Sequence, residues 1–119
     1  MILCYIPTSI DDKEIDRRVD LLLYKYDIFF IEDDDILIST ETNQKLLRVT
    51  IIHYKPILFW INSIEELQIT PTEICELIIF ILKNRCSFHS EMDGLYFEKG
   101  EIDTVYPQIF EVFRNSDKN

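Results

Sequence analysis

Several residue types are scarce in this chain, and each scarcity excludes a class of function. The 119 residues include no alanine and only two glycines, Gly94 and Gly100. Loops that wrap phosphate groups need several glycines close together, so a nucleotide-binding loop of that kind is excluded. The three cysteines are odd in number and far apart, which does not suit a disulfide framework. The chain therefore suggests a reducing environment.

Long apolar runs are also missing. The apolar run ICELIIFILKN is too short to cross a bilayer and contains Glu76. The first apolar run has no basic residues before it and stops at Pro7, which does not resemble a signal peptide. We therefore expect a cytoplasmic protein without a membrane-spanning helix.

Basic side chains are the third scarce class. Twelve Lys and Arg face 22 Asp and Glu, so the net charge is -10. Nucleic acid and anionic membranes would be repelled, because binding them requires clustered cations. A positively charged protein is the partner that this charge would attract, although excess carboxylate also serves solubility alone. The charge is concentrated at the two ends, with net values of -6 over residues 1–45, zero over 46–86 and -4 over 87–119.

The remaining composition predicts one folded domain. Hydrophobic residues make up 47% of the chain, enough for a sizeable core. Periodicity predicts a short strand over residues 1–7 and an amphipathic helix over 10–25, with Ser9 as its cap. The domain should span 1–114, and residues 115–119 should form a frayed tail.

The middle of the chain is predicted to be mostly β. Residues 28–32 and 36–40 should form a hairpin around three aspartates. Residues 46–54 alternate in polarity, with Leu47, Val49 and Ile51 on one face, and should form a strand with His53 in phase with the core face. A further strand should follow at 57–62, and the short connections favour antiparallel pairing.

Three further features complete the prediction. Thr70, Pro71 and Glu73 predict a capped helix over 71–86 whose apolar residues cover nearly its whole circumference, so that it is buried in the domain or against a partner. Asp93-Gly94 predicts a hairpin, and Pro107 should open a last helix. The fold class is α+β: a single domain with a mostly antiparallel sheet of about five to seven strands, packed with an N-terminal amphipathic helix and a buried central helix.

Four consecutive carboxylates, Glu32, Asp33, Asp34 and Asp35, raise the first question of function. A metal site is poorly supported, because adjacent side chains of a strand–turn–strand cannot all point to one ion. A solvated turn and a docking surface remain open. Asp12 and Asp16 begin a second acidic line on the first helix, which is either part of such a surface or an ordinary solvated face.

A second candidate surface lies near the C-terminus. Tyr96 stands close to Glu98, Glu101 and Asp103. An aromatic residue ringed by carboxylates is typical of an interface that receives a basic protein. The alternative is a hairpin that only closes over the core.

Catalytic and metal-binding patterns are not found. Cys86 and His89 form one irregular pair, whereas zinc motifs normally come as two close pairs. His53 and His89 are the only imidazoles, and neither lies in a strained or glycine-rich loop. We therefore predict no enzyme activity, no metal and no cofactor.

These observations predict an acidic protein-binding inhibitor of the immunity or antitoxin type. It would neutralise a basic partner enzyme, such as a nuclease toxin, by occluding its active or substrate-binding site. The alternatives are an acidic escort protein that forms a homodimer through helix 71–86, and a small enzyme with an unlocated carboxylate site. The predicted partner-binding residues are Glu32, Asp33, Asp34, Asp35, Asp12, Asp16, Tyr96, Glu98, Glu101 and Asp103.

Overall fold

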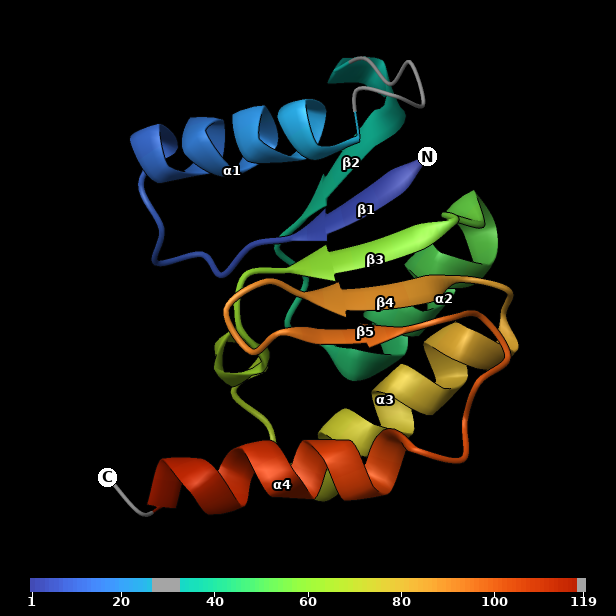
Figure 1. Ribbon diagram of the computed structural model, residues 1–119. Coiled ribbons are helices and arrows are strands. Elements are labelled where there is room, and N and C mark those ends of the chain that lie inside the picture. Colours follow the sequence, from blue (N-terminus) through green and yellow to red (C-terminus); the bar gives the residue numbers. More distant parts are fainter. Residues whose placement is uncertain (27–32, 118–119) are drawn as a thin grey trace.

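Strands and helices alternate along the chain in the computed structural model, which describes residues 1–26 and 33–117. The elements in chain order are β1 (Ile2–Tyr5), α1 (Asp12–Lys25), the 3₁₀ helix η2 (Asp33–Asp35), β2 (Ile36–Ser39), α2 (Gln44–Tyr54), β3 (Leu58–Ile61), the 3₁₀ helix η3 (Ile64–Leu67), α3 (Pro71–Lys83), β4 (Ser87–Ser90), β5 (Leu95–Phe97) and α4 (Val105–Asp117). The described residues form a single α+β domain with four α-helices and one five-stranded sheet (Figure 1). The Cα radius of gyration is 13.8 Å, close to the roughly 13.5 Å of a compact domain of this length.

The sheet is mixed, and the prediction of a mostly antiparallel sheet was wrong. Its strand order is β2-β1-β3-β4-β5 (Figure 1). Strands β1 to β4 are parallel to their neighbours, and only β5 is antiparallel to β4. Parallel neighbours need a crossover connection, which α1, α2 and α3 each provide.

The cause of this error is α2, which occupies the segment predicted as a strand over 46–54. Leu47 and Ile51 are four residues apart and buried, whereas Val49 is exposed, so the burial follows the helical period. The Asn43 side chain caps the helix by accepting hydrogen bonds from the backbone N–H groups of Lys45 (3.0 Å) and Leu46 (3.1 Å). Apolar residues on both sides of this helix produced the misleading alternation. His53, predicted on the core face, is exposed.

The predicted hairpin over 28–40 can be compared only in part, because residues 28–32 lie outside the described residues. The acidic residues 33–35 form η2, and β2 follows directly. In the described part of the chain β2 pairs with β1 in parallel. Asp33–Asp35 therefore lead into a parallel edge strand.

The helices and the hairpin that local patterns predicted are present, although some caps and ends differ. Helix α1 is capped by Asp11 instead of Ser9, and the Asp11 carboxylate accepts a hydrogen bond from the Glu14 N–H at 2.9 Å. Helix α3 begins at Pro71 with the expected capping box. The β4–β5 hairpin turns at Gly94, whose φ of +63° carries no steric cost for glycine because it lacks a Cβ. Helix α4 begins two residues before Pro107 and extends into 115–117, which the sequence had assigned to the tail.

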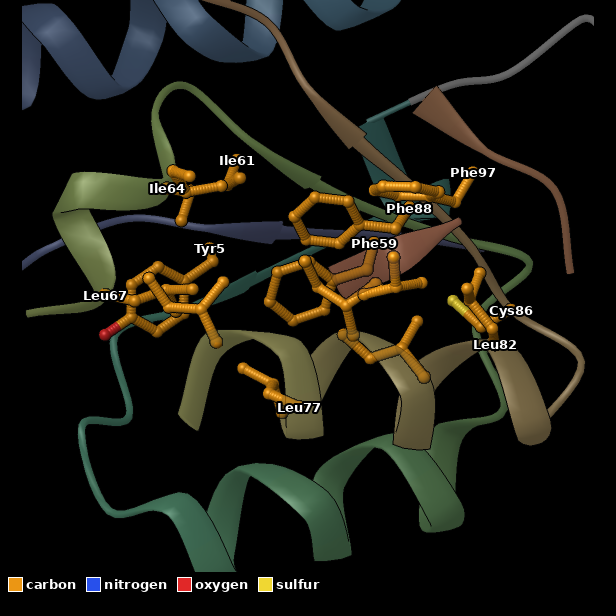
Figure 2. Packing of buried hydrophobic residues seen from close by; sticks show 14 of the residues in the cluster. Tyr5, Phe59, Ile61, Ile64, Leu67, Leu77, Leu82, Cys86, Phe88 and Phe97 are labelled. Carbon is orange, nitrogen blue, oxygen red and sulfur yellow. The ribbon is translucent and has the colours of Figure 1, made fainter. Parts of the chain in front are cut away.

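Two apolar clusters lie on opposite faces of the sheet. On one face α1 packs over Ile2, Cys4, Leu58 and Trp60. On the other face α2, α3 and α4 cover a larger cluster that contains the buried residues of α3. Figure 2 shows this larger cluster, in which the Phe59 ring stacks on Phe88, with ring centroids 5.7 Å apart. Among the helices of the described residues, none is long and apolar enough to cross a bilayer.

Candidate functional site

The sheet face that carries α1 is covered by a helix on one half only. Side chains alternate between faces along each strand, and the α1 side of β1 and β3 is apolar. The same side becomes polar across β4 and β5, where it presents Ser87, His89 and Tyr96. Within residues 1–26 and 33–117, α1 is the only α-helix that packs on this face. Among the described residues, no helix covers the half of this face formed by β4 and β5.

A pocket of about 290 Å³ lies on this face, where β1, β3 and β4 begin and β5 ends. We call it the tyrosine pocket, because Tyr26 from the end of α1 and Tyr96 from β5 both line it. Its full lining is Ile2, Tyr26, Ile57, Leu58, Ser87, Tyr96, Glu98 and Lys99. Most of this lining is apolar, so a ligand with an apolar body would fit it.

The polar part of the pocket is organised around the Glu98 carboxylate. The Tyr96 hydroxyl donates a hydrogen bond of 2.9 Å to Glu98 Oε1. The Ser87 hydroxyl donates a longer one of 3.4 Å to Glu98 Oε2 and accepts one of 3.1 Å from the Lys99 N–H. Burial and the nearby Glu98 charge both raise the pKa of Tyr96, which keeps its hydroxyl protonated as a donor. These hydrogen bonds fix the orientation of the Glu98 carboxylate.

The segment around the pocket is acidic. It comprises residues 87–104, which carry five acids and one base: Glu91, Asp93, Glu98, Glu101, Asp103 and Lys99. The two acids of the β4–β5 turn, Glu91 and Asp93, are already engaged within the protein. Asp93 Oδ2 accepts a 2.8 Å hydrogen bond from the Ile64 N–H, and Glu91 pairs with Lys25. Glu98, Glu101 and Asp103 are exposed. Among the described residues, the pocket lining itself contains one acid, Glu98, and one base, Lys99.

His89 contacts both tyrosines of the pocket. It is paired in register with Trp60 on β3 and Tyr96 on β5. Its Nδ1 lies 3.5 Å from the Tyr26 hydroxyl, and its ring meets the Tyr96 ring edge-on at 6.0 Å. Burial lowers the pKa of His89; Glu91 opposes this effect and Lys25 adds to it, so the ring is neutral at neutral pH. A neutral, packed imidazole supports the two tyrosines.

Glu91 joins the end of α1 to the sheet beside this cluster. Its carboxylate accepts hydrogen bonds from Lys25 Nζ at 2.6 and 2.8 Å and from Trp60 Nε1 at 3.3 Å. Burial alone would raise the pKa of Glu91, but these two donors outweigh it and the net shift is downward. Glu91 is therefore an internal ion-pair partner.

The hydroxyl and thiol groups near the pocket and in the core are engaged or buried. The Ser87 hydroxyl is directed to Glu98, and no hydrogen bond joins it to His89. Burial raises the pKa of Cys4 and Cys86 to about 12 and that of Cys75 to about 11, so these thiols are unreactive. In the described part of the chain no three His, Cys, Asp or Glu side chains are placed to hold a metal ion.

A second hollow, of about 340 Å³, lies at the carboxyl ends of β1 and β3. At this point the chain leaves β1 toward α1 on one face of the sheet and leaves β3 toward α3 on the other. Ligands often bind at such a point in sheets of this kind. Here its Glu66 carboxylate is already bound by Arg18, which comes from α1 and is buried. We therefore assign this hollow a structural role.

The structure separates the predicted partner-binding residues into three places. Asp12 and Asp16 lie on α1, while Asp34 and Asp35 directly precede β2. Tyr96, Glu98, Glu101 and Asp103 lie on or after β5. Strands β2 and β5 are the two margins of the sheet, about 19 Å apart at the usual strand spacing. Glu32 is outside the described residues, and the side chain of Asp33 is not described.

Of the predicted residues whose side chains the structure describes, only Tyr96 and Glu98 line the pocket. Sequence reasoning missed Tyr26, Ile57 and Ser87 in its lining, and it treated His89 only as a weak metal ligand. The signal was the alternation of Ser87 and His89 with buried Phe88, and of Tyr96 with buried Leu95 and Phe97. Two adjacent strands with this pattern indicate a sheet face that is partly open.

Comparison of the chain with known protein families and with curated protein sequences finds no match.

Proposed function

We propose that this chain is a non-catalytic binding module that receives a Lys or Arg side chain of a basic protein in the tyrosine pocket. The observation that carries the proposal is the Glu98 carboxylate, oriented by Tyr96 at the polar part of an otherwise apolar pocket. Lys and Arg combine a long apolar stem with a charged end, which matches this arrangement.

Each part of such a side chain has a partner in the pocket. The stem would lie against Ile2 and Leu58, which are apolar and belong to adjacent strands. The cation would pair with Glu98 and lie near the aromatic faces of Tyr26 and Tyr96. Lys99 is the one base of the lining, so the partner's cation should approach from the Glu98 side.

The net charge of -10 supports the same partner class at longer range. Carboxylates that do not line the pocket, such as Asp12, Asp16 and Asp34, would steer a basic protein toward this molecule without contacting it. In the specific form that we propose, the partner is a basic enzyme such as a nuclease toxin, and binding occludes its active or substrate-binding site. Association should then be fast and weakened by salt.

The test is an NMR titration of the isotope-labelled protein with an oligo-arginine peptide as the probe. The backbone signals of Tyr26, Ser87, Tyr96 and Glu98 should shift first. Glu98→Gln should weaken binding by roughly tenfold, because a charge-assisted pair is lost. The matched control is Glu76→Gln, which changes the net charge equally on an exposed position of α3.

Tyr96→Phe distinguishes binding in the pocket from attraction by the net charge of the protein. It keeps the ring and the charge and removes the hydrogen bond that orients Glu98. We expect an affinity between those of the native protein and Glu98→Gln. Equal weakening by the Glu98 and Glu76 variants, or shifts centred on α1, would refute the pocket as the binding site.

A further inference from the structure

The outer face of α2 is a second surface that the proposed function does not use. Leu46, Val49 and Ile52 are 53%, 58% and 52% exposed, although all three are aliphatic. They succeed one another at intervals of three residues and so lie on one side of the helix. The opposite side of α2 carries Leu47 and Ile51, which are buried in the core. Within the described residues, nothing covers the outer side.

The charge of this face differs from that of the rest of the protein. Helix α2 contains none of the 22 acidic residues, and its two formal charges are the cations Lys45 and Arg48. The Arg48 guanidinium lies over the Phe80 ring of α3, 5.5 Å from its centre, so it is partly engaged within the protein. A basic partner would find no carboxylate on α2.

We propose that two copies of this chain associate through the outer faces of their α2 helices, packed antiparallel about a twofold axis. Two molecules of charge -10 repel each other, and they approach with least repulsion where each presents apolar side chains and no acid. An antiparallel pair would place Val49 near the axis. It would also bring Lys45 of each copy toward the C-terminal carbonyl groups of the other α2, which attract a cation.

This arrangement replaces the homodimer through helix 71–86 that the sequence suggested. The apolar residues of α3 are packed within the domain, between the sheet, α2 and α4. Helix α2 and the tyrosine pocket lie on opposite faces of the sheet. A dimer through α2 therefore leaves both pockets open, and the inference does not depend on the proposed function.

The first test is sedimentation equilibrium of the purified protein at several concentrations and salt levels. We expect a monomer–dimer equilibrium in which salt strengthens the dimer, because it screens the repulsion between the two copies. Val49→Glu should raise the dissociation constant roughly tenfold or more. Tyr24→Glu is the matched control, because Tyr24 is 83% exposed on α1, and it should leave the constant unchanged.

The second test uses a disulfide across the axis. Val49→Cys should form linked dimers on mild oxidation, and Tyr24→Cys should not. The native cysteines are buried and add no background. A protein that stays monomeric under all conditions, or equal linkage of the two cysteine variants, would overturn the proposal. A monomer that instead binds a polyglutamate peptide on α2 would assign this face to an acidic partner and overturn it equally.

Discussion

Arg18 offers the sharpest test of how this fold is held together. It is 3% exposed and comes from α1, yet it binds η3, which is 48 residues away in sequence. Its NH1 and NH2 groups donate to the two oxygens of Glu66 at 2.9 and 2.8 Å, and its Nε donates to Glu14 at 3.0 Å. We predict that Arg18→Met, which keeps most of the side-chain volume, markedly lowers the free energy of unfolding.

The magnitude follows from the environment of Glu66. Removing one partner of a buried ion pair costs about 3–5 kcal/mol, because the other charge stays desolvated. The Glu66 side chain retains 17% exposure, so water can reach part of the carboxylate after the substitution. We therefore expect a loss at the lower end of that range, about 3 kcal/mol. A typical domain has a total stability of about 5–15 kcal/mol, so this loss is a large fraction.

The assay is urea unfolding followed by far-UV circular dichroism and Trp60 fluorescence. The control is Arg17→Met: Arg17 also pairs with Glu14, at 2.6 Å, but its side chain is 55% exposed. Exposed pairs contribute little to stability, so this variant should unfold close to the native midpoint.

A double variant tests whether the unpaired Glu66 carboxylate causes the loss of stability. If the cost arises from the stranded Glu66 carboxylate, then Arg18→Met combined with Glu66→Met should recover part of the stability lost in the single variant. Equal losses of unfolding free energy in the Arg17 and Arg18 variants would refute the role of Arg18 as the buried residue that joins α1 to η3. No recovery of stability in the double variant would refute it equally.

Three further predictions follow from single contacts, each measured by urea unfolding. Burial lowers the pKa of His89; the Glu91 charge opposes this shift and the Lys25 charge adds to it. The unfolded chain therefore binds a proton more readily than the folded protein does, and the free energy of unfolding should fall as the pH drops below 6.5. His89→Gln should remove this part of the fall. Gly94→Ala should cost about 1 kcal/mol, because φ is +63° there although an added Cβ meets nothing within 4 Å. Thr70→Ala should also cost about 1 kcal/mol through loss of the α3 cap. An unchanged pH profile in His89→Gln would contradict the role given to His89. A Gly94→Ala or Thr70→Ala variant as stable as the native protein would contradict the role given to that turn or cap.

Features encoded by neighbouring residues could be predicted from the sequence. The amphipathic helix α1, the Thr70–Glu73 capping box and the Asp93-Gly94 turn each depend on contacts within a few residues, and the structure contains all three. The pairing of Tyr96 with Glu98 belongs to the same class, because two positions along a strand lie on one face.

The nature of α2 required the tertiary structure. Its sequence satisfies both periods: Leu47, Val49 and Ile51 alternate as in a strand, while Leu47 and Ile51 also recur as in a helix. The choice depends on which side chains the sheet and α3 cover, and that contact is not local. The parallel direction of β2, β1 and β3 follows from the same choice.

By itself, then, the sequence determined the charge of the protein, the capping box of α3 and the Asp93-Gly94 turn, because these depend on residues close together in the chain. The tertiary structure decided the order of the strands, the burial of α3 and the composition of the tyrosine pocket. Tyr26, Ile57, Ser87 and Tyr96 meet only because β1, β3, β4 and β5 pair side by side. Such pairing reflects the balance of burial over the whole domain, which no local segment of the chain encodes.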